Sequence, residues 1–176
     1  PTASVFLKQV PVNSTTQKID VPQDIKTSIF ELATEITPDY FQVSEKDNQI
    51  FSPLSLWYAL GVLREGATGE TLAELNEMMK LPAAFDSSMV IPDLSATLNF
   101  MEASQLAKDK SRHGIQLTNG IFFDDRFKDN ILESYWQKAA EVWGTETARV
   151  DFTREEATKE VIRQWVSDKT EAFIDD

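Results

Sequence analysis

The sequence contains no cysteine and a single histidine, and these two shortages remove several classes of site. Without cysteine there can be no disulfide, no zinc–thiolate site and no cysteine nucleophile. A Ser/His/Asp triad would have to use His113, and any metal site would depend almost entirely on carboxylates. Neither shortage identifies the compartment in which the protein works.

Long apolar runs and positive charge are also scarce. No run is long enough to span a bilayer. Lys and Arg number 17 against 29 Asp and Glu, which gives a net charge of −12. This balance argues against nucleic acid or an anionic membrane as the main partner, because both require clustered positive charge. The 176 residues are 41% hydrophobic, which suffices for one domain with a sizeable core.

The most informative stretch that is present runs from Phe51 to Leu63. A short apolar run ends at Ser52-Pro53, where Ser52 can cap a helix and Pro53 suits its first turn. The apolar residues that follow cover every side of that helix. A helix that is apolar all round is buried, so we expect this one at the core of the domain.

The chain before and after this stretch reads mainly as helices. Residues 1–22 carry three prolines and many polar residues, and we interpret them as an extended arm. Apolar residues at helical spacing predict helices over 24–37, 70–80 and 93–108, with a connector at 83–92. In the second helix, Thr71 with Glu74, or alternatively Thr68, could form the cap.

The period changes in the second half of the chain. Alternation predicts strands over 114–123 and 145–152, separated by a helix over 130–143 that ends before Gly144. Thr153 and Glu156 have the spacing of a capping box that opens a last helix. The fold class is therefore α+β. Two strands are too few for an independent sheet, which indicates that these residues are part of a larger fold.

No constellation of catalytic residues emerges. Ser52 precedes a proline and lacks the glycine pattern of a nucleophile elbow, so we favour a helix cap over a triad with His113. Asp124, Asp125 and Asp129 lack the spacing of a calcium loop, which favours a polar turn. The four tryptophans fall on helical faces expected to be buried: Trp57, Trp136, Trp143 and Trp165. We expect no enzyme activity, no cofactor and no metal.

Two surface features remain as weaker hypotheses. Lys108, Lys110 and Arg112, next to His113, could bind a sulfated polysaccharide such as a glycosaminoglycan, but we favour a solvated loop. Asn13 begins the one Asn-x-Ser/Thr triplet and is a candidate glycosylation site. The first residue is Pro1, which fits a processed secreted protein or a trimmed chain.

Three segments in unbroken order resemble the serpin family. The segment 51–75 resembles the family's helix B and the entry to that helix, at Ser52, Pro53, Ser55, Gly66, Ala67, Gly69 and Thr71. The segment 117–152 resembles two strands of sheet A with helix E between them, at Asn119, Phe122, Phe127 and Val150-Asp151-Phe152. The following segment resembles helix F, at Ala157, Ile162, Trp165, Val166, Thr170 and Ile174. Arg163 and Ala172-Phe173 depart from the usual helix F pattern. The likeness extends over residues 25–176.

The resemblance implies the N-terminal part of a serpin fold, with helices A to F, strands of sheet A and one strand of sheet B. Residues 23–176 would form part of a single domain whose reactive-centre loop lies outside this chain. Ser52 and Ser55 match positions in the family's shutter region, beneath the strands that separate when the loop inserts.

The resemblance also implies a function. The expected activity is inhibition of serine proteases by a suicide-substrate mechanism, in which the cleaved loop inserts into sheet A. The alternative is a non-inhibitory serpin that serves as an extracellular carrier, chaperone or storage protein. The expected partners are a target serine protease and the remaining C-terminal serpin polypeptide. Nucleic acid and membrane are not expected as partners, and the expected location is extracellular.

Overall fold

The computed structural model describes residues 20–43, 50–108 and 117–174. The chain divides into two compact units, one within Val12–Leu117 and one that comprises Thr118–Asp176 together with an N-terminal segment outside the described residues. Each unit is described by itself. The expectation that residues 23–176 form part of one domain stays a prediction.

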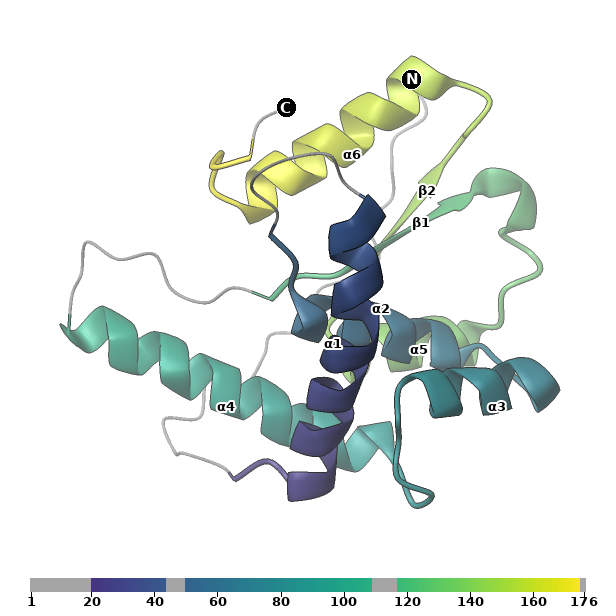
Figure 1. Ribbon diagram of the computed structural model, residues 1–176. Coiled ribbons are helices and arrows are strands. Elements are labelled where there is room, and N and C mark those ends of the chain that lie inside the picture. The colour runs from purple at the N-terminus through teal and green to yellow at the C-terminus, as the bar shows by residue number, and fades with distance from the viewer. Residues whose placement is uncertain (1–19, 44–49, 109–116, 175–176) are drawn as a thin grey trace. The chain divides into compact units, whose positions relative to one another are not determined.

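The first unit is helical (Figure 1). Its helices are α1 (Gln23–Val43), α2 (Pro53–Glu65), α3 (Gly69–Met78) and α4 (Ser87–Lys108). The strand of sheet B that the resemblance implies is not found among the described residues, since Ile50 and Phe51 carry no strand pairing.

A buried polar link joins the helices of the first unit. The Trp57 indole N–H donates to Ser28 Oγ at 2.9 Å, and the Ser28 hydroxyl donates to the Met79 carbonyl at 2.5 Å. These three residues are buried, and Ile25 and Leu32 of α1 are buried as well. Because each polar atom in the link has a partner, the link joins α1, α2 and the end of α3 without an unsatisfied group of its own.

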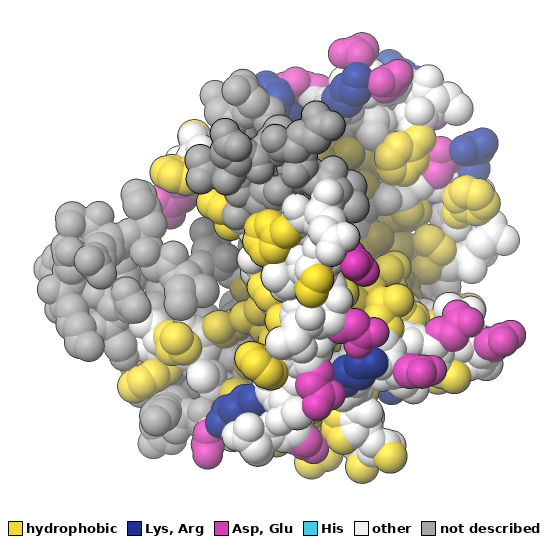
Figure 2. Space-filling view, viewed as in Figure 1, with side chains coloured by type: hydrophobic (Ala, Val, Ile, Leu, Met, Phe, Trp, Pro, Cys, Tyr) yellow, Lys and Arg dark blue, Asp and Glu magenta, His cyan; other side chains and the backbone are white. Residues whose placement is uncertain are grey.

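The expectation that α2 is buried on every side was wrong. Trp57, Tyr58 and Val62 are buried, but Leu63 is 60% exposed and Ala59 is also exposed. In the described part of the chain, neighbouring helices therefore cover one face of α2. Figure 2 shows apolar side chains at the surface of the molecule. In α1, Phe30 is 68% exposed.

Two helices extend beyond their expected ranges and contain a proline. The helix α1 continues through Pro38, and α4 begins at Ser87 with Pro92 inside it. The connector expected at 83–92 was therefore wrong from Ser87 onward. A proline removes one N–H from the helix, and packing of the remaining turns can outweigh that loss. At the start of α4, the Asp86 carboxylate accepts the Ser88 N–H at 2.9 Å.

The second unit contains a strand–helix–strand unit followed by a helix. Its elements are β1 (Gly120–Asp124), the 3-10 helix η1 (Asp125–Phe127), α5 (Glu133–Glu141), β2 (Glu146–Val150) and α6 (Glu155–Lys169). The two strands are parallel, with Gly120 opposite Glu146 and Asp124 opposite Val150. Both observed strands lie within or close to the expected ranges but are shorter.

Alternation along β1 places a helix on each face of the sheet. Phe123 stacks on Trp136 of α5, with ring centroids 4.6 Å apart. Its neighbour Phe122 meets Trp165 of α6 edge to face, with centroids 5.5 Å apart. Because successive strand residues point to opposite faces, α5 and α6 cover opposite sides of the two strands.

The expected capping box of the last helix was wrong. The cap position of α6 is Arg154, and no side chain caps that helix. Thr153 instead donates its N–H to Asp151 Oδ1 at 3.0 Å, and its hydroxyl donates to the same oxygen. Asp151, two residues upstream, accepts both of these hydrogen bonds, as in an Asx turn. Thr68 is the cap residue of α3, as one of our two alternatives proposed, but it makes no side-chain capping bond.

Candidate functional site

The two candidate shutter residues lie at the start of α2. Ser52 is the cap residue, and its Oγ accepts the Ser55 N–H at 3.3 Å. The Ser55 hydroxyl donates to the same oxygen at 2.8 Å. The expected cap is therefore confirmed. Both serines are exposed in the structure, so their shared hydrogen bonds stabilise the first turn and leave the pair accessible.

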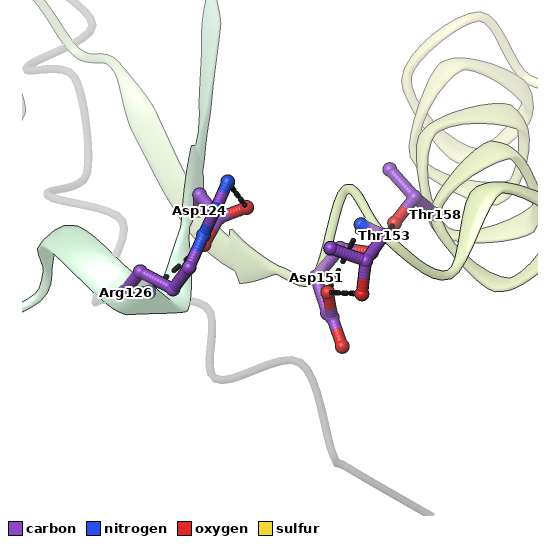
Figure 3. Close-up of polar contacts among 5 residues, drawn as sticks. All are labelled: Asp124, Arg126, Asp151, Thr153 and Thr158. Atoms are coloured by element: carbon purple, nitrogen blue, oxygen red, sulfur yellow. Dashed lines mark hydrogen bonds and ion pairs between the residues drawn. The ribbon is translucent and has the colours of Figure 1, made fainter.

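In the second unit, polar side chains gather where the two parallel strands end (Figure 3). Asp124 closes β1 and is only 5% exposed. Its Oδ1 accepts the Arg126 N–H at 2.9 Å and Nε–H at 2.8 Å, and its Oδ2 accepts a terminal N–H of the same guanidinium at 3.0 Å. The turn expected at Asp124-Asp125-Arg126 is confirmed, and it is built around one carboxylate.

These bonds also control the acidity of Asp124. The guanidinium of Arg126, then the backbone N–H of Arg126, lower the pKa of Asp124 from 3.8 to about 2, against the opposing effect of desolvation. The Phe152 backbone N–H contributes in the same direction. Asp124 therefore stays ionised at neutral and mildly acidic pH, with its charge balanced by Arg126.

Asp151 organises the connection from β2 to α6 (Figure 3). Its carboxylate accepts from Thr153, and its carbonyl accepts the Thr158 hydroxyl at 2.8 Å. Thr158 lies one turn into α6 and is buried. The bond from Thr158 therefore ties the first turn of the helix back to the end of the strand.

A cavity of about 560 Å³ lies among these residues. Its lining comes from the ends of both strands, η1 and the first two turns of α6: Asp124, Asp125, Arg126, Lys128, Arg149, Val150, Asp151, Thr153, Arg154, Ala157, Thr158 and Val161. It is therefore bounded by four cationic side chains, three carboxylates and a small apolar surface.

The opposite end of the same two strands is fastened to α6 by Trp165. Its indole N–H donates to Glu146 Oε2 at 2.7 Å, and the other oxygen of Glu146 pairs with Lys169. Gly120, opposite Glu146 in the register, lies against the ring. A Cβ at that position would stand 2.9 Å from Trp165 Cζ2, so glycine is required for this approach. We call Glu146, Trp165 and Lys169 the α6 clamp.

Several predicted residues cannot be placed. Asn13, Lys110, Arg112 and His113 lie outside the described residues, and the side chain of Lys108 does as well. Among the described residues, no group of three His, Asp or Glu side chains is arranged to hold a metal. No helix in the described ranges is long and apolar enough to cross a membrane.

Three of the four tryptophans are buried as expected, and Trp165 is half-buried because its indole edge reaches Glu146. Sequence reasoning did not identify the α6 clamp. Residues 146 and 165 are separated by a strand end, a turn and a helix, and no local spacing connects them. One signal was available: Gly120 and Phe122 lie on the same face of the predicted strand, and a glycine there leaves room for a large ring to approach.

Comparison with known proteins identifies the family of the chain. The family model described as "Serpin (serine protease inhibitor)" matches residues 28–176. Rat (Rattus norvegicus) neuroserpin is 28% identical over 132 residues, which cover 75% of this chain and 30% of that protein. Mouse (Mus musculus) leukocyte elastase inhibitor A is 31% identical over 144 residues, covering 81% of this chain and 35% of that protein.

The solved structures agree on the fold. Serpin48 of the insect Tenebrio molitor superposes with a TM-score of 0.66 at 18% identity, covering 87% of this chain and 39% of that one. The chain thus spans about a third of the length of the curated relatives it matches. Members of this family are protease inhibitors and not enzymes, although non-inhibitory members exist. The family match, the mixed helix–strand architecture and the fold neighbours together show that this chain belongs to the serpin family and carries an N-terminal portion of the serpin fold.

Proposed function

We propose that the protein containing this chain inhibits a serine protease as a suicide substrate. The observation that carries the proposal is the serpin match over residues 28–176. In this mechanism the protease cleaves a reactive-centre loop, which then inserts into sheet A and traps the covalent intermediate. The loop would come from sequence beyond this chain, so the protease and the residue that sets its specificity are not encoded here.

Two features of the described residues support this proposal. In the second unit, β1 and β2 are parallel neighbours, and α6 lies on one of their faces through Trp165. In the first unit, Ser52 and Ser55 stand at the start of α2 with their hydroxyls bonded to each other. We propose that these serines have the role of the family's shutter residues and that residues 23–176 belong to one domain.

The test uses the intact protein and a panel of serine proteases. We expect one protease to form a complex that survives boiling in SDS, with a mass equal to the protease plus the part of the inhibitor N-terminal to the cleaved bond, because the C-terminal part is released as the leaving group. A protease inactivated beforehand at its catalytic serine should form no such complex, because the acyl bond cannot form. If no protease in the panel reacts with the protein, or if each one cleaves it without forming the complex, inhibition as a suicide substrate is excluded. The non-inhibitory carrier is then the favoured alternative.

We further propose that the protein is secreted and glycosylated at Asn13. Its Asn-Ser-Thr triplet lies in a polar segment of the sequence. Secretion from cultured cells and a mass shift on N-glycosidase treatment, absent in Asn13→Gln, are the expected results. A protein retained in the cytosol would contradict the proposal.

A solvated loop remains our preferred interpretation of Lys108, Lys110 and Arg112, and weak retention on immobilised heparin at physiological salt is expected.

A further inference from the structure

The cavity at the ends of β1 and β2 has the size of a ligand site. Its volume of about 560 Å³ falls within the range of pockets that hold small organic molecules, which is about 300–1,000 Å³. All of its lining residues belong to the second unit. Among the described residues, its walls are formed by the strand ends, η1, α6 and the segments that connect them.

Positive charge is concentrated at this cavity. Four of the 17 Lys and Arg residues line it, Arg126, Lys128, Arg149 and Arg154, in a chain whose net charge is −12. The acidic pair in the first turn of α6, Glu155 and Glu156, does not line the cavity and pairs with Lys159 instead. The cavity is therefore more basic than the surface around it.

The three carboxylates in the lining already have partners. Both oxygens of Asp124 bind Arg126, and Asp151 accepts from Thr153. Asp125 lies 3.5 Å from a terminal nitrogen of Arg149. These pairs hold the carboxylates against the protein, so they reduce the repulsion that an incoming anion would meet.

The same pairs leave hydrogen-bond donors available on the arginines. A guanidinium carries five N–H donors in a planar fork. Arg126 uses Nε–H and one terminal nitrogen for Asp124, and Arg149 pairs with Asp125 through one terminal nitrogen. Each guanidinium can therefore keep its internal carboxylate and still bind an external one, a sulfonate or a phosphate.

An apolar surface lies beside these charges. Val150 ends β2, and Ala157 and Val161 are one turn apart on α6. Since both kinds of side chain line the same cavity, a ligand bound there can touch the aliphatic residues and lie near the cationic ones. Charge and apolar contact together select for an amphiphilic ligand and against an inorganic ion.

We propose that this cavity binds a small organic anion, an aromatic or aliphatic group carrying one carboxylate, sulfonate or phosphate. The anionic group contacts Arg149, while Arg126, Lys128 and Arg154 add positive charge around it, and the apolar part rests on Val150, Ala157 and Val161. This site is independent of the proposed protease inhibition, because it uses neither a reactive-centre loop nor the serines of α2.

The test is calorimetric titration of the intact protein with naphthalene-1-sulfonate, inorganic sulfate and the uncharged naphthalene-1-methanol. We expect saturable one-to-one binding of the sulfonate, and at least about tenfold weaker binding of each comparator, because each lacks one of the two contacts. Amide signals of Ala157 and Val161 should shift in NMR spectra on addition of the sulfonate. Raising the salt concentration should weaken binding.

Matched variants locate the site. Arg149→Gln and Arg154→Gln should each weaken sulfonate binding about three- to tenfold, with Lys128→Gln as a further variant at the rim. Arg163→Gln is the control. Arg163 is on α6, pairs with Glu160 and does not line the cavity. Thermal unfolding of each variant verifies that it is folded.

Three results would overturn the proposal. Absence of saturable binding at millimolar sulfonate would show that the cavity is not a binding site. Equal affinity for inorganic sulfate would exclude a preference for amphiphilic ligands, because the apolar surface then contributes nothing to binding. Equal weakening by Arg163→Gln and Arg149→Gln shows binding to general surface charge. None of these results bears on whether the protein inhibits a protease.

Discussion

Gly120 and Glu146 face each other across the two strands, and each meets α6 through a different part of Trp165. Gly120 gives the ring room to approach, whereas Glu146 accepts its N–H. The position of α6 over the sheet therefore depends on the absence of one side chain and on the presence of another.

Replacement of Gly120 by alanine should be destabilising. The new Cβ would stand 2.9 Å from Trp165 Cζ2, so the ring must shift, and overpacking of this kind costs about 1–3 kcal/mol. Urea unfolding of the intact protein measures the loss. In a Trp165→Phe background the cost of Gly120→Ala should fall, because the smaller ring lacks the clashing atoms. Equal costs in both backgrounds would contradict the contact.

Asp124 should make stability depend on pH in the acid range. Its folded-state pKa of about 2 is below the ordinary value of 3.8. A group with a lowered folded pKa stabilises the native state above the unfolded value, and this contribution is lost as pH falls through the folded value. Between about pH 4 and pH 2, the wild-type protein should lose stability more steeply than Asp124→Asn. Parallel pH profiles, measured by chemical unfolding, would exclude this role.

At the scale of elements, α2 depends on its cap. Ser52→Ala removes the acceptor for the Ser55 N–H and should reduce the free energy of unfolding by about 1 kcal/mol. Ser55→Ala keeps the cap and removes only the hydroxyl–hydroxyl bond, so its effect should be smaller. Equal effects would show that the hydroxyl pair matters more than the cap. Comparison of inhibition rates of the two variants would then test the proposed shutter role.

The α6 clamp should govern how readily α6 detaches from the strands. Glu146→Ala leaves the Trp165 N–H and Lys169 without their acceptor, which should cost about 1–3 kcal/mol. Hydrogen exchange should accelerate in α6, because local opening becomes easier. Glu160→Gln, which breaks an exposed pair with Arg163 on the same helix, is the matched control and should change exchange little. Unchanged exchange in Glu146→Ala would contradict the clamp.

At the scale of the whole molecule, the described units leave large apolar side chains exposed. Phe30, Leu63 and Met89 are each at least 60% exposed, and the sheet has only the strands β1 and β2 in the described ranges. The relatives are about three times longer than the stretch they share with this chain. These facts suggest that additional polypeptide covers these faces in the folded protein.

Residues 23–176 produced alone should therefore bind 8-anilinonaphthalene-1-sulfonate strongly and unfold over a broad range of urea. Exposed apolar surface binds the dye, and loosely packed side chains make unfolding less cooperative. The intact protein, under identical conditions, should unfold sharply with little dye binding. A sharp transition and no dye binding for residues 23–176 would show that this portion is an independent folding unit.

Intact mass before and after denaturation would reveal any separate complementary polypeptide.

The sequence by itself determined the helices, the Ser52 cap, the Asp124 turn and the alternation of the two strands. Each depends on residues a few positions apart, so local spacing carries the information. The serpin family followed from three ordered segments.

The tertiary structure alone decided which faces are buried and which distant residues meet. Sequence periodicity marked α2 as apolar on all sides, but only packing shows that Leu63 is exposed. Packing also keeps Pro38 and Pro92 inside helices, although proline by itself disfavours the interior of a helix. The α6 clamp and the basic cavity join side chains separated by whole elements. Such contacts depend on strand register and helix placement, which no local pattern specifies.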